Sequence, residues 1–157
     1  MPRCYTVNLT LTAIANATTD LAEFGAADDI PIGIRAIRWW QTSDFTDAQD
    51  EGLELQLVRG NTASGSGGAT ATPVRKGVKN SAASFSAEVG NTTAASGGTP
   101  EIPWRTGFNV RQGLDVIIPE TEMVWTDQGT GFLALRLATA PADSITMAVS
   151  IDVWEMA

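Results

Sequence analysis

The chain has 157 residues, with one cysteine, no histidine, and 18 acidic against 10 basic side chains, which gives a net charge of −8. These numbers exclude a disulfide framework, a Cys/His zinc site and every nucleophilic pair that needs an imidazole. The net charge disfavours nucleic acid and anionic membrane as partners, and no apolar run approaches the roughly 20 residues that span a bilayer.

Small residues dominate the rest of the composition, with 22 alanines, 19 threonines, 15 glycines and 9 serines. Such residues suit tightly packed strands, whereas surface helices favour Glu, Lys and Leu. The composition therefore indicates an all-β chain. At this length the chain is most economically a single domain, residues 1–157.

Alternation of apolar and polar side chains predicts the strands in chain order. From Tyr5 to Ala13 the apolar residues recur at every second position, which is the period of a strand. The segment 30–42 is also extended, but its apolar phase shifts after Ala36, which indicates a bulge or bend. Further strands are predicted over residues 20–25, 53–59, 84–89, 107–111, 114–118, 122–126 and 133–137. Residues 44–51 are compatible with a single helical turn.

Two glycine-rich stretches fall in the long loop regions that we expect at 60–83 and 90–101. Residues 60–72 and 90–100 each begin Gly-Asn-Thr and continue through small residues to Gly-Gly. Composition alone produces such matches, so no repeat at the level of the fold is inferred. The segment Gly65–Gly68 lacks the following helix and the Lys-Ser/Thr of a phosphate-binding loop, so we interpret it as a flexible loop.

The last strand has one of the clearest patterns, with apolar residues at every second position from Ile145 to Val153. The strand at 133–137 and the turn at 140–143 precede it, and we interpret the two strands as a hairpin. Eight to ten strands with frequent turn residues predict an antiparallel β-sandwich or a jelly-roll-like barrel.

Four cations, Arg59, Arg75, Lys76 and Lys79, lie in a stretch of the chain that has no acidic residue. The remainder of the chain is then near −12, because these four contribute +4 to the total of −8. We predict that this basic region docks on an acidic partner or on a neighbouring subunit. The alternative is a solvated loop whose charges only keep it soluble.

The tryptophans are the second group of candidate binding residues. Trp39 and Trp40 are adjacent in one strand, so they must point to opposite faces of the sheet. Trp154 falls on the polar face of the last strand. We predict that Trp40 and Trp154 contribute to a protein interface. Stacking on sugar rings, for which Trp104 is a further candidate, and burial in a two-layer core are the alternatives.

Acidic residues form three groups: Asp28 with Asp29, Asp47 with Asp50 and Glu51, and Glu120 with Glu122. Two carboxylates across a cleft would serve a carboxylate-dependent hydrolase. Several oxygens would bind a structural cation, although the second group lacks the spacing of an EF-hand. Exposed loop acids are the simpler interpretation, so no catalytic residue, metal or cofactor is predicted.

Several short phrases of the sequence resemble one kind of protein over nearly the whole chain. They are the opening Met-Pro-Arg-x-Tyr-x-Val, the loops Arg59–Thr62, Ser64–Gly68 and Asn91–Ala94, and the segments Phe108–Arg111 and Pro141–Met147. Together they are similar to small all-β virion structural proteins of tailed bacteriophages. The similarity lies in turns and strands, and no catalytic residue is carried over.

This resemblance implies a capsid decoration, or cement, protein that binds the major capsid protein as a homotrimer. The expected location is the capsid surface of the virion. Assembly is expected in the host cytoplasm, because the start of the chain has no apolar signal region. The expected function is then non-enzymatic stabilisation of a shell. The alternative is a carbohydrate- or receptor-binding module of a phage tail or head fibre.

Overall fold

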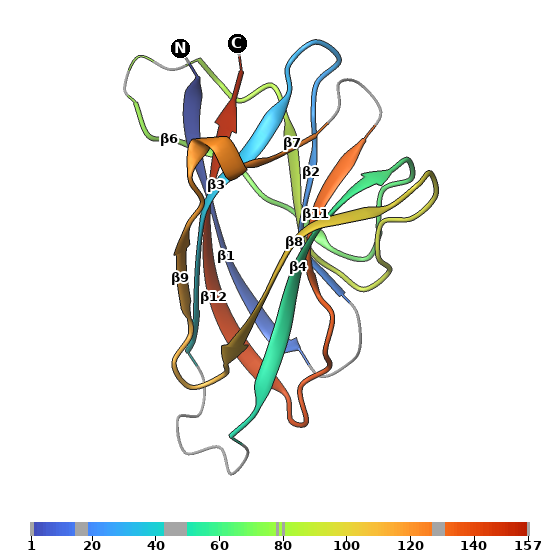
Figure 1. The fold of residues 1–157 in the computed structure, drawn as a ribbon, viewed down its shortest axis with the longest axis vertical. Helices are drawn as coiled ribbons and strands as arrows, with labels where there is room; N and C mark the ends of the chain where they lie inside the picture. Colours follow the sequence, from blue (N-terminus) through green and yellow to red (C-terminus); the bar gives the residue numbers. More distant parts are fainter. Residues whose placement is uncertain are drawn as a thin grey trace.

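Two antiparallel sheets pack face to face in the computed structural model, which describes residues 2–14, 19–42, 50–77, 79, 81–126 and 131–156 (Figure 1). Sheet A contains β1 (Arg3–Ile14), β3 (Ile32–Gln41), β6 (Val74–Arg75), β9 (Leu114–Ile117), β10 (Val124–Trp125) and β12 (Ile145–Glu155). Sheet B contains β2 (Thr19–Gly25), β4 (Gly52–Asn61), β5 (Ala69–Thr70), β7 (Ser86–Asn91), β8 (Glu101–Asn109) and β11 (Phe132–Leu137). A 3-10 turn, η1 (Glu120–Glu122), lies between β9 and β10.

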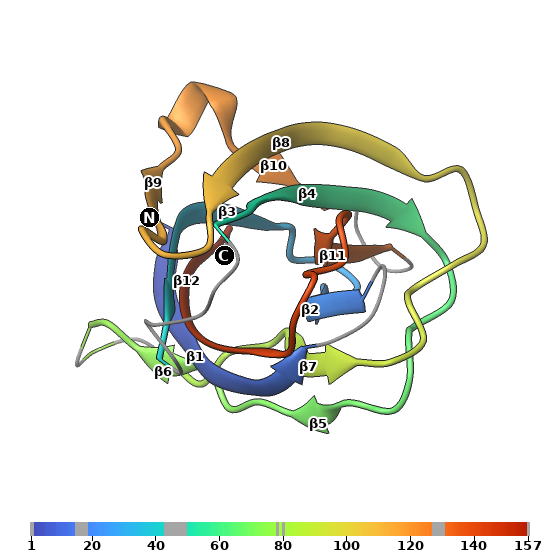
Figure 2. The same ribbon diagram turned by 90° about the horizontal axis from the view of Figure 1, so that it is seen from below.

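The order of sheet A is β10-β3-β12-β1-β6, with β9 also paired to β3, and the order of sheet B is β5-β7-β2-β11-β4-β8. The prediction of an antiparallel all-β sandwich is confirmed. The barrel alternative is wrong, because no ladder joins the two sheets within the described ranges. Viewed from below, the sheets stand opposite one another around a common interior (Figure 2).

The core forms where the apolar faces of the two sheets meet. Tyr5 and Val7 of β1 and Leu133 and Leu135 of β11 are fully buried there. Trp39 is 1% exposed and its ring packs edge-on against Phe108, with centroids 5.5 Å apart. Apolar residues of β1, β3, β4, β11 and β12, mostly at alternate positions, therefore form one continuous hydrophobic cluster.

The bulge predicted in the segment 30–42 is confirmed. The register of β3 against β12 shifts between Asp152 and Val153, and Arg35 is the additional residue on β3. The extra residue lets Ile34 and Ile37 both point into the core, which explains the change of apolar phase.

The predicted hairpin at the C-terminal end is wrong. β11 pairs with β2 and β4 in sheet B, whereas β12 pairs with β1 and β3 in sheet A, so the turn at 140–143 connects the two sheets. Both strands face the same core, and alternation alone does not distinguish a hairpin from a connection across a sandwich.

Two other predicted elements differ in extent. β8 begins at Glu101, before the predicted range 107–111, because an edge strand that contains Pro103 carries little apolar alternation. The strand predicted at 122–126 is reduced to β10, since η1 occupies its start. The helical turn proposed at 44–51 lies largely outside the described residues.

The two glycine-rich stretches form a third layer on the side of sheet B that faces away from sheet A (Figures 1 and 2). Residues 62–68 run from β4 to β5, beyond β7, and residues 92–100 run from β7 to β8, beyond β4. The two segments, hereafter the crossed loops, must therefore pass each other over β2 and β11. Gly65–Gly68 lies in this layer, where the Gly65 amide bonds to Glu23 and Ser66 forms a bridge with Thr93.

Backbone hydrogen bonds join the crossed loops in a nearly two-fold arrangement. Ala63 and Ser96 exchange N–H···O bonds of 2.8 and 3.0 Å, and Ser66 and Thr93 exchange two of 3.0 Å. These two pairs are equivalent under an offset of 30 residues, because 63 corresponds to 93 and 66 to 96. The resemblance between the stretches therefore reflects a local two-fold pairing.

Buried carboxylates of β2 hold the crossed loops on sheet B. Asp20 accepts a 2.6 Å bond from the amide of Ala95 and forms two bonds with Arg136 of β11, at 2.6 and 3.0 Å. Glu23 accepts bonds from the Ser64 hydroxyl at 2.5 Å and the Gly65 amide at 2.8 Å. The polar side of β2 is thus covered by protein and does not face solvent.

Candidate functional site on the outer face of sheet A

Within the described residues, no layer comparable to the crossed loops covers the side of sheet A that faces away from the core. We call it the outer face of sheet A. Register places its residues in rows across β1, β12 and β3, with Asn8 opposite Ser150 and Ser150 opposite Arg38. Its members are Thr6, Asn8 and Thr10 of β1, Ala148, Ser150, Asp152 and Trp154 of β12, and Arg38 and Trp40 of β3.

Asp152 is the centre of a charged cluster on this face. Its carboxylate accepts bonds from the Lys76 ammonium at 2.6 Å, the Thr6 hydroxyl at 2.8 Å and the Arg38 guanidinium at 3.0 Å. Burial acts to raise the pKa of Asp152, but the bonds from Lys76, Thr6 and Arg38 outweigh it and the pKa is lowered. Two cations therefore share one buried carboxylate, and only the more distant Asp115, 3.7 Å from Arg38 Nε and largely exposed, adds a second negative charge.

Trp154 lies at the end of the face that is nearer the chain termini. The guanidinium of Arg35 lies 5.5 Å from the centre of its ring, and the Arg35 side chain also donates a hydrogen bond to the carbonyl of Ile118, just before η1. Trp154 is on the polar side of β12, as the alternation predicts, but it is half-buried. Burial raises the pKa of Cys4, its neighbour across the strands, and so disfavours the reactive thiolate.

Trp40 lies toward the opposite end, where β3 finishes. Its side chain is 45% exposed, while adjacent Trp39 is buried, so the prediction that the two point to opposite faces is confirmed. Trp40 borders a shallow depression of about 340 Å³, which is also lined by Asn8, Thr10 and Ala148. Trp104, the third candidate for stacking, packs against the core from β8.

The four cations of the predicted basic region do not lie together. Arg59 is on β4 of sheet B, where it forms an ion pair of 2.8 Å with Glu101. Arg75 is on β6 at the edge of sheet A, Lys76 bonds to Asp152, and Lys79 is exposed in the following segment. Arg59 therefore lies on a different sheet from Arg75 and Lys76, and docking through these cations stays a prediction.

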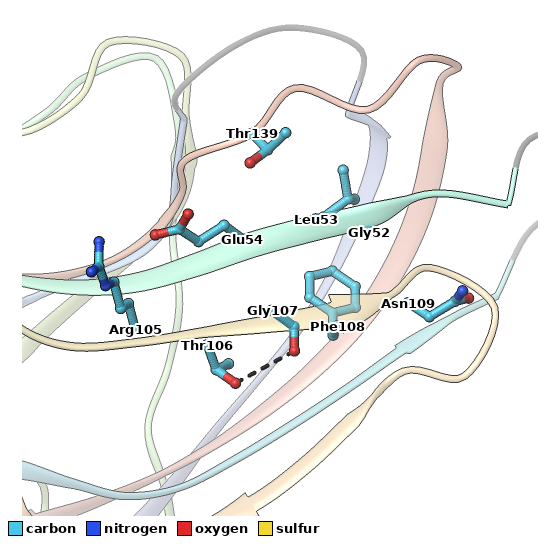
Figure 3. A pocket seen from close by; sticks show the side chains of 9 residues that line it. All are labelled: Gly52, Leu53, Glu54, Arg105, Thr106, Gly107, Phe108, Asn109 and Thr139. Carbon is cyan, nitrogen blue, oxygen red and sulfur yellow. Dashed lines mark hydrogen bonds between the residues drawn. The ribbon is translucent and has the colours of Figure 1, made fainter.

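A larger depression of about 690 Å³ lies along β4 and β8 of sheet B (Figure 3). It is open and is lined by Glu54, Arg105, Gly107 and Thr139, among others, and the side chain of Phe108 is buried in its wall. No motif or pattern in the sequence predicts this depression. It has charged groups but no exposed aromatic ring for a ligand to stack on.

The acidic groups singled out in the sequence are dispersed. Asp28, Asp29, Glu120 and Glu122 are exposed, and Asp47 lies outside the described residues. Within the described part of the chain, no three His, Cys, Asp or Glu side chains are placed to hold a metal ion. No described helix is long and apolar enough to cross a membrane.

Sequence reasoning missed the residues that complete the outer face of sheet A. Arg35, Arg38 and Asp152 carry no motif, and each looks like an ordinary solvent-facing residue of a strand. Register across three strands brings Asp152 next to Thr6 and Lys76, and the available signal, alternation, reports the face of a residue but not its neighbours.

The fold and this face thus define an all-β sandwich with one broad exposed sheet surface. No family model matches the chain, and no curated protein matches it. Among solved structures the chain is similar to a chain of the T13 IBDV viral particle, with 11% identity and a TM-score of 0.22. That alignment covers 99% of this chain and 39% of the viral chain, and a likeness at this TM-score carries no argument about function.

Proposed function

We propose that the chain is a non-enzymatic structural protein of a phage particle, and specifically a capsid decoration protein. In this proposal the outer face of sheet A binds the major capsid protein at the surface of the virion and stabilises the shell. A homotrimer over the capsid lattice is part of the same proposal.

The observation that carries the proposal is the charge of the outer face of sheet A. The cations on or beside this face are Arg35, Arg38, Arg75 and Lys76, and they outnumber its two acids, Asp152 and Asp115. The whole chain is at −8, so this face differs in sign from the rest of the protein. A local cationic surface on an acidic protein suits docking on an acidic protein surface, since complementary potentials steer and orient association.

The edges of the sheets differ in how they could accept a neighbouring strand. β10 has two residues and β9 has four, and Pro103 of the longer β8 has no N–H to donate. β6 pairs with β1 only at Tyr5 and Thr6, so no described strand pairs with the rest of that side of β1. Docking through the outer face therefore rests on its charge.

Co-sedimentation with shells assembled from the capsid protein of the same genome tests this proposal. The wild-type protein should pellet with the shells, and binding should weaken as salt is raised. Arg75→Glu should weaken binding. Arg105→Glu, an identical charge reversal in an exposed cation of sheet B, is the matched control and should bind as the wild type does. Failure to bind shells, together with absence from purified particles by mass spectrometry, would contradict the proposal.

A further inference from the structure

The tryptophans with access to solvent differ in how much of the ring a ligand could reach. Arg35 covers the ring of Trp154, and Trp104 packs against the core. Trp40 is 45% exposed, on an open part of sheet A. Of these three, only Trp40 offers a broad aromatic surface that no described side chain occupies.

The depression beside Trp40 combines this ring with small polar groups. Asn8 and Thr10 lie on β1, across β12 from Trp40, and Ala148 between them leaves room above the sheet. Within the described ranges the side chains of Asn8 and Thr10 make no hydrogen bond, so an amide and a hydroxyl are available. The volume of about 340 Å³ is at the lower end of the range for small-molecule sites, about 300 to 1,000 Å³.

This set of groups matches the two chemistries of a sugar ring. A pyranose has a C–H face that packs on an aromatic ring, and hydroxyls at its rim that exchange hydrogen bonds with amide and hydroxyl side chains. None of the residues that line the depression is charged. The larger depression on sheet B has Glu54 and Arg105 but no exposed aromatic ring, and so lacks the first of these chemistries.

We propose that the depression beside Trp40 is a binding site for a neutral saccharide. One pyranose ring stacks on the indole of Trp40, and its hydroxyls bond to Asn8 and Thr10. The site is shallow and open, so it suits a ring within or at the end of a glycan chain. The depression lies on the face that we propose docks on the shell, so the protein free of the shell is the form that binds the saccharide. Arg75 and Lys76 lie outside the depression, so Arg75→Glu tests docking separately from saccharide binding.

A glycan array that carries neutral and sialylated glycans, followed by calorimetric titration with the best neutral ligand, tests the inference. The wild-type protein should bind neutral glycans. Trp40→Ala should weaken binding by about tenfold or more, because aromatic stacking on one ring is typically worth that much. Asn8→Ala should weaken it less. Ile117→Ala removes an exposed apolar side chain of the same sheet outside the depression and should leave binding unchanged.

Three results would overturn the inference: no neutral glycan bound by the wild-type protein, binding restricted to charged glycans, or binding that Trp40→Ala leaves intact. Thermal unfolding of each variant establishes that it is folded, which is expected because Trp40 and Asn8 are exposed. If Trp40 anchors a protein instead, Trp40→Ala reduces co-sedimentation with shells while no glycan binds. That pattern would refute the saccharide site and leave the proposed function standing.

Discussion

Replacing Asp20 with asparagine should destabilise the protein far more than removing an exposed charge. The Asp20 side chain is fully buried and Arg136 is only 16% exposed, so their two bonds are shielded from solvent. Asparagine keeps the shape of aspartate, but its amide group places N–H donors where Arg136 and the Ala95 amide also donate. The variant therefore leaves a buried guanidinium without its counter-charge.

The expected magnitude follows from this geometry. Breaking a buried ion pair by removing one partner typically costs about 3–5 kcal/mol. Because a domain of this kind has a stability of about 5–15 kcal/mol, Asp20→Asn should remove a large share of it. The matched control is Glu101→Gln, which breaks the pair with Arg59. Those side chains are 58% and 38% exposed, so the expected cost is at most about 1 kcal/mol.

Urea unfolding followed by tryptophan fluorescence measures both variants. The double variant Asp20→Asn with Arg136→Met removes both charges and should recover much of the lost stability. Hydrogen exchange of the Ala95 amide should accelerate in Asp20→Asn, since its acceptor is altered. A cost for Asp20→Asn no larger than that of Glu101→Gln would refute the role of this pair in holding the crossed loops.

Two further predictions concern the crossed loops and the charged cluster. Gly98→Ala should destabilise by more than about 1 kcal/mol in urea unfolding, since its φ is +65° and a Cβ would lie 2.3 Å from the Gly60 carbonyl oxygen. Gly52→Ala, where a Cβ meets nothing within 4 Å, should be neutral, and equal losses would contradict the packing argument. The pKa of Asp152 is lowered in the folded protein. The ionised side chain therefore stabilises the fold at pH values above the ordinary aspartate pKa, and this stabilisation is lost as the pH falls through the pKa of the folded protein. The stability difference between wild type and Asp152→Asn should therefore shrink below about pH 4, and a difference independent of pH would argue against that pairing.

Alternation was sufficient to predict most of the sandwich, because one core-facing side is common to all its long strands. It placed Trp39 and Trp40 on opposite faces of the sheet, and the phase change near Ala36 marked the bulge at Arg35. It could not identify the partner of a strand, and so the hairpin ending in β12 was wrong. Pairing depends on contacts between segments far apart in sequence, which a local period does not contain.

The polar side of β2 shows the same limit in another form. Asp20 and Glu23 are three residues apart, so strict alternation would place them on opposite faces. The register of β2 against β11 shifts at Leu21, and both carboxylates bond to the crossed loops and are buried beneath them. The glycine-rich composition of the crossed loops did not indicate that they cover these residues, since glycine occurs both in flexible loops and where two backbones approach closely. Gly98 and its contact with Gly60 belong to the second case.

The chain between β4 and β8 contributes β7 to sheet B and Phe85 to the core, where Phe85 packs on Tyr5 and Phe24. The loops on either side of β7 are rich in Gly, Ser, Thr and Ala, and buried carboxylates attach them to the sandwich. Asp20 and Glu23 hold the crossed loops, Asp152 bonds to Lys76, and Glu155 accepts the amide of Ser84 at 2.9 Å. Each of these carboxylates is buried and accepts several donors, which is the arrangement that makes a buried charge tolerable. Part of the acidic excess of this chain is therefore internal structure, and the exposed charge that a partner meets on the outer face of sheet A is set by Arg38, Lys76 and their neighbours.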